Sequence, residues 1–399
     1  MTFTAIFAIL LLIIIWLIFD FQLGRKRHLS ILEKNESAIL YGDFDIFPHG
    51  KELFADYFQE LKKAKKHIHV LFYILKDDEI SHKFLHILEE KAREGVEVRL
   101  ILDRLGSFKV TKKAIKSLRE AGGQFAFSNQ IKFPFLFYSI QVRNHRKISI
   151  IDGVIGYLGG FNIGKEYIDL DQKLSPWRDY HLKITGESVP FLQHTFLNEW
   201  KEYAEVDVNS SLYFPEQQLK GTVPHQFLAT EGAFLEDSFI RLIQMAKESI
   251  IIGTPYFIPS KIIFDNLISA ANRGVIVNII VPYTADHILV QEASFRYLRK
   301  LLKVGANIYQ FKNGFYHAKT LTIDNQICDI GTANFDKRSL FLNKEINCYI
   351  YNSEFTERLM GIIHKDMLES EPLTLKDLTK RNFFRSVKER IAEVVSFFL

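Results

Sequence analysis

The chain has 399 residues, enough for about two or three domains. Its hydrophobic content of 47% and charged content of 25% are ordinary for a globular protein and exclude a disordered, collagen-like or coiled-coil chain. Two cysteines exclude a disulfide scaffold and a four-cysteine zinc site, and a net charge of +4 is too small by itself to indicate a nucleic-acid-binding protein.

The N-terminus carries an uncharged apolar run from Phe3 to Phe19, with Trp16 near its end. A helix over this run is about 25 Å long, near the lower limit for crossing a bilayer. Basic residues follow at 25–27 and none precedes the run. We therefore expect a transmembrane anchor over residues 1–24, with the rest of the chain on the cytoplasmic side. A cleaved signal peptide is the alternative, but the basic start and small-residue cleavage site are missing.

Strand-like and helix-like segments alternate beyond residue 40. Apolar runs predict strands over residues 67–75 and 96–103, and helical periodicity predicts helices over residues 81–94 and 112–121. Such alternation indicates an α/β fold, with helices flanking a mixed β-sheet.

The same order of segments recurs in the second part of the chain. AKK at residues 64–66 is echoed by AKE at 246–248, 182 residues later, and GVEV at 95–98 is echoed by GVIV at 274–277, 179 residues later. Only two copies are present, so a duplication fits better than a solenoid of repeats.

The duplication is clearest in two copies of one motif, HRKISIIDGVIGYLGGFN and HAKTLTIDNQICDIGTAN, in which His, Lys, Asp and Asn stand at offsets 0, 2, 7 and 17. The fixed residues are His145, Lys147, Asp152 and Asn162 in the first copy, and His317, Lys319, Asp324 and Asn334 in the second. We predict two homologous domains, residues 38–205 and 225–365, joined by a linker over 206–224 and related by pseudo-twofold symmetry.

The motif suggests a site for phosphate. On a strand, residues i and i+2 share a face, so each copy presents an imidazole and an ammonium group side by side. Gly159 and Gly331 fit a tight turn or close approach to a ligand, and each asparagine that follows adds amide donors. If both copies share one pocket, one histidine can attack phosphorus, giving a covalent phosphohistidine, while the other protonates the leaving alcohol. Lysine and asparagine donors would stabilise the phosphoryl oxygens, with no metal or other cofactor required.

A nucleophilic imidazole also needs an acceptor on its other ring nitrogen. Asp152 and Asp324 belong to the motif, but they stand at the predicted strand ends, where we expect them to bond backbone or turn groups. Asp179, in WRDYHLK, and Glu345, after NFDKRSLFLN, are the better candidates for orienting the histidines.

The paired H-x-K-x4-D-x6-G-x-x-N motifs resemble the phospholipase D superfamily and, more narrowly, its bacterial cardiolipin synthases. The resemblance extends over about residues 38–365. Its other matching stretches are FYILKDD (72–78), LDRLGS (102–107), GGFNIGKEY (159–167), WRDYHLKITG (177–186), TPYFIPS (254–260) and GTANFDKRSLFLNKEIN (331–347).

This resemblance implies a phosphatidyltransferase in the bacterial cell membrane, with phosphatidylglycerol as substrate and no nucleic-acid partner. His145 would be the nucleophile that takes the phosphatidyl group and releases glycerol, and His317 would be the general acid and base. A second phosphatidylglycerol would then accept the group to give cardiolipin. Two features depart from the family: one predicted membrane helix where two are usual, and Gly160 and Thr332 where serine is common.

Alternative functions stay open at this point. The same scaffold can carry a phospholipase D-type hydrolase, another phosphatidyltransferase or a nuclease, although the mild charge and the predicted anchor argue against a nuclease. An inactive lipid-binding scaffold is a further alternative, but it would be expected to carry a broken motif, and both copies are complete.

Two more segments have a composition that suits membrane contact. The aromatic stretch KFPFLFY at residues 132–138 fits a loop that dips into the membrane at the pocket mouth, or else a buried loop. Residues 375–399 alternate basic and apolar residues, which predicts a basic amphipathic helix on anionic lipid; a helix docked on the protein's own surface is the alternative.

Overall fold

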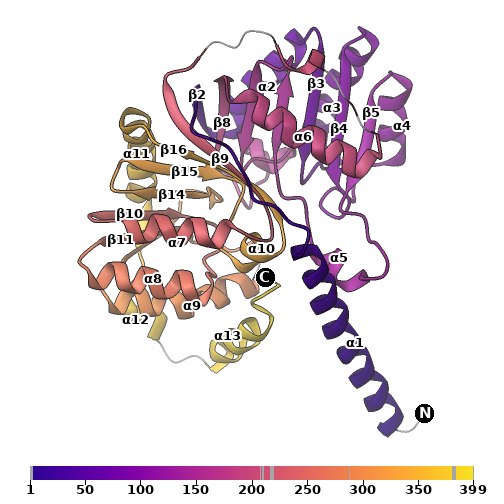
Figure 1. The fold of residues 1–399 in the computed structure, drawn as a ribbon. Coiled ribbons are helices and arrows are strands. Elements are labelled where there is room, and N and C mark those ends of the chain that lie inside the picture. The colour runs from indigo at the N-terminus through magenta and orange to yellow at the C-terminus, as the bar shows by residue number, and fades with distance from the viewer. Residues whose placement is uncertain are drawn as a thin grey trace.

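A computed structural model describes residues 3–206, 208, 211–215, 220–286, 288–379 and 383–398. The two halves lie side by side, each with helices flanking a part of the sheet, and one long helix projects from the body (Figure 1). The helices are α1 (Phe3–Leu29), α2 (Gly50–Lys63), α3 (Glu79–Arg93), α4 (Lys112–Glu120), α5 (Leu136–Gln141), α6 (Val189–Ala204), α7 (Leu235–Met245), α8 (Lys261–Asn272), α9 (Ile288–Lys303), α10 (Lys337–Phe341), α11 (Ser353–Leu368), α12 (Leu375–Thr379) and α13 (Phe383–Val395), with short 3₁₀ turns η1 (Lys165–Ile168) and η2 (Ser211–Tyr213).

The first half forms a mixed sheet in the spatial order β5-β4-β3-β6-β7-β8-β2. Strands β3, β4 and β5 pair in parallel and the remaining neighbours are antiparallel. The bounds are β2 (Leu40–His49), β3 (His67–Phe72), β4 (Glu97–Asp103), β5 (Gln124–Ser128), β6 (Ile148–Ile151), β7 (Ile155–Gly159) and β8 (Trp177–Gly186).

The second half repeats this order as β12-β11-β10-β14-β15-β16-β9. Strands β2 and β9 pair with each other and join the two sheets. The bounds are β9 (Val223–Glu231), β10 (Ser249–Gly253), β11 (Ile276–Pro282), β12 (Asn307–Phe311), β14 (Thr320–Ile323), β15 (Ile327–Gly331) and β16 (Lys344–Ile350); the short strands β1 (Asn35–Glu36), β13 (Phe315–Tyr316) and β17 (Ser370–Pro372) pair with β9, β8 and β12. The predicted fold of two related α/β halves is therefore confirmed.

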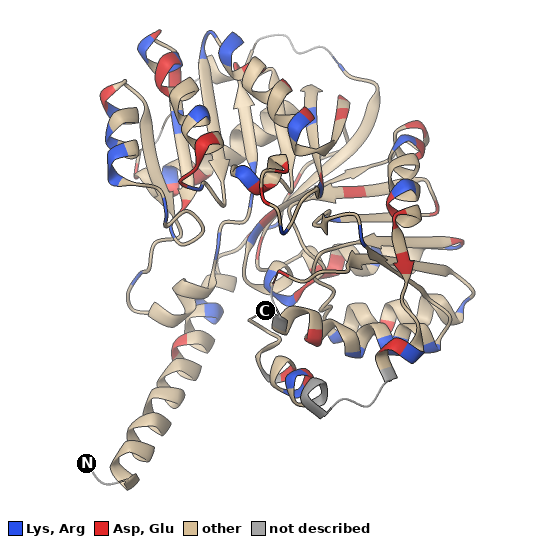
Figure 2. Ribbon diagram, turned by 180° about the vertical axis from the view of Figure 1, so that it is seen from behind, with Lys and Arg blue, Asp and Glu red and all other residues tan. Residues whose placement is uncertain are grey.

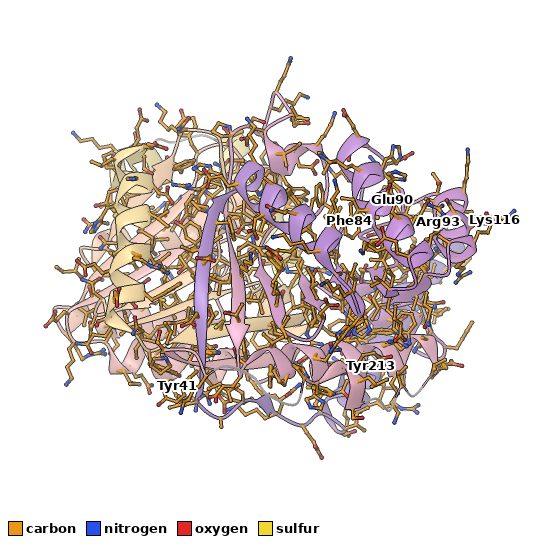
Figure 3. All side chains as sticks on the ribbon, turned by 90° about the horizontal axis from the view of Figure 1, so that it is seen from above. Tyr41, Phe84, Glu90, Arg93, Lys116 and Tyr213 are labelled. Atoms are coloured by element: carbon orange, nitrogen blue, oxygen red, sulfur yellow. The ribbon has the colours of Figure 1, made fainter. Side chains whose placement is uncertain are left out.

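Local sequence explains the elements near the site. Strand β3 is buried along its whole length because both faces are covered, as its unbroken apolar run predicts. Helix α3 begins two residues earlier than predicted, because the Asp78 side chain accepts a hydrogen bond from the Ser81 N–H and caps it. Its Phe84 packs inward, whereas Lys116 of α4 lies at the outer edge of the first half (Figure 3).

The predicted linker 206–224 is described only in part, since residues 207, 209, 210 and 216–219 lie outside the described residues. Within it, Tyr213 is buried and its hydroxyl donates a hydrogen bond to Glu97 on β4. The predicted linker therefore includes a contact with the first half.

Helix α1 is longer than the predicted anchor, because it continues through the basic residues to Leu29. It is the described helix that is long and apolar enough to cross a membrane, with a mean hydropathy of 2.7 over its most apolar window. Charged residues appear only where α1 meets the body (Figure 2). There the Tyr138 N–H on α5 donates a 2.8 Å hydrogen bond to Asp20, and Gly24 lies against the same tyrosine.

The C-terminal segment forms two helices, α12 and α13, instead of the single predicted helix over 375–399; residues 380–382 and 399 lie outside the described residues. Helix α13 packs on α9, with Ala392 buried and an ion pair of 2.9 Å between Arg299 and Glu389. Val387 and Ile391 are exposed on its outer side. One side of α13 is thus docked on protein, and the outer side leaves room for a lipid contact.

The end of the chain also meets helix α1. The rings of Phe397 and Phe398 lie 5.6 and 5.3 Å from the ring of Phe21 on α1. In the predicted aromatic loop, Phe133 is 86% exposed and Tyr138 is buried. Helix α1, helix α5 and the C-terminal tail therefore gather at one place on the body.

Candidate active site

His145 and His317 line the same cavity, which has a volume of about 770 Å³. Each stands in the extended segment just before a hairpin strand, His145 before β6 and His317 before β14, and each hairpin strand is buried. The motif residues are thus next to the strands, not within them as the spacing suggested.

Each ring is hydrogen-bonded by a carboxylate from the opposite half. His145 Nδ1 donates to Glu345 Oε2 at 2.9 Å, and His317 Nδ1 lies 2.6 Å from Asp179 Oδ2. Glu345 stands on β16 of the second half and Asp179 on β8 of the first half. This crossed pairing fixes the position of Nδ1, so Nε2 is the nitrogen available for chemistry.

The backbone repeats the crossed arrangement. The His145 N–H donates to the Lys344 carbonyl at 2.9 Å, and the His317 N–H donates to the Arg178 carbonyl at 2.7 Å. Lys344 and Arg178 immediately precede the two carboxylate residues. The role of these two residues in anchoring the histidine backbone was not predicted from the sequence. The sequence feature that could have indicated it is the basic residue directly before each carboxylate residue.

Both motif lysines are buried beside their histidines. Lys147 Nζ donates to the His145 carbonyl at 2.6 Å, and Lys319 Nζ lies 2.5 Å from His317 Nδ1 and 3.3 Å from Asp179. Burial lowers the pKa of Lys147 to about 7, and the nearby Lys319 charge acts in the same direction. A phosphate oxygen in this cavity would favour the ammonium forms of both side chains.

Burial also favours neutral imidazoles. It lowers the pKa of His145, against the opposing charge of Glu345, and lowers the pKa of His317 to about 4, with Lys319 adding to the effect. Burial alone would raise the pKa of Glu345, but His145 and Lys147 hold it below its usual value. At neutral pH the cavity therefore presents neutral imidazoles held by ionised carboxylates.

The two motif asparagines also line the cavity. Asn162 Oδ1 accepts the Ile74 N–H at 3.1 Å, which orients its amide. A side chain at Gly159 would meet the β8 backbone at His181, 2.5 Å away, and one at Gly331 would meet the β16 carbonyl of Ile346 at 2.6 Å. These glycines therefore allow a neighbouring strand to approach closely. The sequence had suggested a tight turn or close approach to a ligand at these positions.

Asp152 and Asp324 bond backbone groups. Each carboxylate accepts backbone N–H bonds from three successive residues, 65–67 for Asp152 and 247–249 for Asp324. Although burial opposes ionisation, these donors hold the pKa of Asp324 below its usual value. The stability that Asp324 contributes is thus present above the ordinary aspartate pKa and is lost as the pH falls through its lower folded-state pKa.

We expect Asp152→Ala and Asp324→Ala each to lower the free energy of unfolding by about 1.5–3 kcal/mol, because charge-assisted bonds to backbone donors are lost. Denaturant unfolding in detergent micelles measures this. The exposed Asp265, paired with Lys261 on one helix, gives a matched control in Asp265→Ala, expected to change stability by less than about 0.5 kcal/mol. Loss of turnover at unchanged stability would instead assign the motif aspartates to the chemistry.

Gly160 and Thr332 occupy equivalent places beside the two carboxylates. Thr332 Oγ1 donates to Glu345 Oε2 at 2.6 Å, whereas a side chain at Gly160 would stand 2.0 Å from Asp179 Oδ1. The departure from serine at Gly160 is thus required by the position of Asp179, since any side chain there would displace the carboxylate.

Gly160→Ala is therefore expected to lower turnover about 100-fold, since a shift of about 1 Å in a group that orients a reacting side chain has an effect of that size. Steady-state kinetics measure the loss. The matched control is Gly361→Ala on α11, where a new methyl group meets no atom within 4 Å. Full turnover in Gly160→Ala would show that Asp179 does not need its observed position.

The remaining cavity wall is largely aromatic and apolar. It includes Tyr73, Tyr167, Trp177, Leu289 and Phe398. Within the described ranges, no group of three or more His, Cys, Asp or Glu side chains is arranged to hold a metal ion. The arrangement can bind an oxyanion between imidazole and amide groups, with the buried ammonium groups next to the histidines and a surface suited to lipid beside them.

Comparison with known proteins identifies the family. The family profile described as "Cardiolipin synthase, PLD-like domain" matches residues 57–174 and 239–367. The chain is 40% identical to the minor cardiolipin synthase ClsB of Bacillus subtilis (strain 168), over 100% of this chain and 99% of that protein. It is 37% identical to the major cardiolipin synthase ClsA of the same organism, over 93% of this chain and 79% of that protein.

A solved structure supports the fold. The crystal structure of phosphatidylserine synthase from Haemophilus influenzae Rd KW20 superposes with a TM-score of 0.72 at 15% identity, covering 94% of this chain and 99% of that one. With the duplicated motif and the full-length similarity, the chain belongs to the cardiolipin synthase family of phospholipase D-like proteins.

Proposed function

We propose that this protein is a membrane-anchored cardiolipin synthase that transfers a phosphatidyl group from one phosphatidylglycerol to another. The observation that carries the proposal is the crossed pair of histidine–carboxylate contacts lining one cavity, in a chain similar over its full length to cardiolipin synthases. The family acts on phospholipids at the membrane, and α1 supplies a membrane anchor. Phosphatidylglycerol as the specific substrate is part of the proposal.

In the first step, Nε2 of neutral His145 attacks the phosphorus of the donor lipid. The negative charge of the bound phosphodiester favours the protonated form of His317, which takes up a proton as the donor lipid binds. The bond from phosphorus to the glycerol oxygen then breaks, and His317 gives this proton to that oxygen, so glycerol leaves. The two motif asparagines line the cavity, where they would donate to the phosphoryl oxygens, and Lys147 and Lys319, buried beside the histidines, add positive charge that stabilises the developing negative charge. Glu345 stabilises the charge that His145 acquires on forming phosphohistidine.

In the second step, His317 acts as a base. It takes the proton from the headgroup hydroxyl of a second phosphatidylglycerol, whose oxygen attacks phosphorus. The nitrogen–phosphorus bond breaks, cardiolipin forms and neutral His145 is restored. Assignment of the nucleophilic step to His145 follows from the family resemblance, since both rings have a carboxylate partner of the same kind.

Hydrolysis is the competing function of the same site. For transfer to dominate, the lipid alcohol must react with the phosphohistidine faster than water does, which requires a cavity that excludes water. The aromatic cavity wall and the junction of α1, α5 and the C-terminal tail beside it favour a lipid acceptor. We infer that the body lies on the cytoplasmic side, because the basic residues at the end of α1 adjoin it.

Purified protein in detergent–lipid micelles with labelled phosphatidylglycerol tests the proposal. Cardiolipin and glycerol are expected in equal amounts. Phosphatidic acid as the dominant product, with little cardiolipin, would show that the protein is a hydrolase. A protease-accessibility assay on sealed vesicles tests sidedness, and cleavage of the body from the extracytoplasmic side would contradict it.

A further inference from the structure

Arg338 is a cation in the cavity wall that neither proposed step uses. It stands on α10, between the second motif and β16. Its guanidinium donates to the Gln141 carbonyl at 2.8 Å and to the Phe398 carbonyl at 3.1 Å, and it lies 3.4 Å from the Gln141 side-chain oxygen. A guanidinium has five N–H donors, so these contacts leave donors available to a ligand.

The setting of Arg338 differs from that of the buried arginines. Each of those is ion-paired: Arg99 with Glu97, Arg143 with Asp103, Arg146 with Glu199, and Arg178 with Asp366. Half-buried Arg338 forms no ion pair with any described carboxylate. Asp336 is the nearby acidic group, but its carboxylate caps α10 by accepting the Ser339 N–H at 2.8 Å.

Arg338 shares the cavity wall with both reacting histidines. Tyr73 lines the same cavity, and its ring lies 5.0 Å from the His145 ring. A phosphate that reacts at His145 and a group bound to Arg338 would therefore occupy one cavity.

The proposed reaction brings a second phosphate to this region. The acceptor phosphatidylglycerol keeps its own phosphodiester intact, a three-carbon glycerol bridge away from the attacking oxygen. Since guanidinium groups match phosphate oxygens in charge and geometry, we propose that Arg338 binds the intact phosphodiester of the acceptor lipid and so selects a phosphate-bearing alcohol over water or a simple alcohol. This inference rests on the proposed function and assigns a specificity-determining residue to it.

Two soluble acceptors that differ in the phosphodiester test the inference: glycerol, and glycerophosphoglycerol, the deacylated form of the proposed acceptor. Transfer to glycerol regenerates phosphatidylglycerol, so the donor is unlabelled and each acceptor carries the label, whose entry into lipid is measured. The wild-type protein should use glycerophosphoglycerol at a lower KM than glycerol. In Arg338→Gln the ratio of kcat/KM for the two acceptors should fall by about tenfold to a hundredfold, the range expected for a lost charge-assisted contact. Arg338→Lys should keep part of the preference.

Lys337→Gln is the matched control. Lys337 stands on the same helix and its Nζ contacts Ser396 in the same tail at 2.9 Å, but it does not line the cavity. Its acceptor ratio should equal that of the wild type. The same ratio in Arg338→Gln as in the wild type, with rates for both acceptors lowered equally, would reduce Arg338 to a structural link between α10, α5 and the tail.

The wild-type measurement is decisive even if the variants fail to fold. The acceptor subsite would be overturned if the wild-type protein showed no preference for glycerophosphoglycerol over glycerol. It would also be overturned if inorganic phosphate inhibited the reaction at the same concentrations at which glycerophosphoglycerol binds. Wild-type protein that makes no cardiolipin would contradict the proposed function, whereas cardiolipin formation with an unchanged ratio in Arg338→Gln would contradict this inference alone.

Discussion

His145→Ala is expected to reduce cardiolipin formation by about 10⁴-fold or more, because removal of a covalent nucleophile leaves only binding and electrostatic contributions. The variant should also release no glycerol from phosphatidylglycerol in a single-turnover experiment. Its fold should be kept, since the His145 N–H bond to the Lys344 carbonyl is made by the backbone.

The control for this variant is His86→Ala. His86 is an exposed histidine on α3, paired with Glu90 of the same helix, and its replacement should leave turnover within about twofold. If His145→Ala protein still turned over phosphatidylglycerol at a substantial rate, His145 would not be the nucleophile.

His317→Ala is expected to lose about 10³- to 10⁴-fold in rate with phosphatidylglycerol, because the glycerol oxygen would leave without a proton. A donor phosphodiester with a p-nitrophenol leaving group needs no such proton. The release of p-nitrophenol should therefore be largely restored in the first turnover of His317→Ala, measured by its absorbance.

The same donor separates the two histidines. His145→Ala should not recover with it, because no nitrogen is present to attack phosphorus. Recovery in His145→Ala and none in His317→Ala would mean that the two roles are exchanged between the halves.

The duplicated motif predicted much of the fold because each copy encodes the same local hairpin. Four residues at fixed offsets recur 172 positions apart at His145 and His317, and the strand order of the two halves repeats around them. Asp179 and Glu345 were named from the sequence as orienting residues, and each lies at a histidine. Their crossed pairing was not predictable, because it depends on how the two halves face each other.

Two features at the ends of the chain differ from the sequence predictions for physical reasons. Helix α1 continues through Arg25, Lys26 and Arg27, because basic residues end the apolar stretch without breaking a helix. The C-terminal pattern is amphipathic, and an apolar face can bind lipid or protein equally well. The buried Ala392 and the Arg299–Glu389 pair show which surface α9 covers.

Arg338 shows what spacing cannot reveal. It stands within the stretch that carries the family resemblance, yet nothing in its position along the chain distinguishes it from the neighbouring Lys337. Only the folded chain places one of these cations in the cavity wall and the other on the tail.

Rapid quenching of the wild-type protein during turnover of labelled phosphatidylglycerol shows whether a histidine carries the phosphatidyl group. The quench is alkaline, since a phosphorus–nitrogen bond is labile in acid, and mass spectrometry of the digested protein locates the label. We expect a phosphatidyl adduct on the peptide containing His145, formed and consumed at the rate of turnover. An adduct on His317 or on another residue, or turnover with no adduct at all, would show that His145 is not the nucleophile.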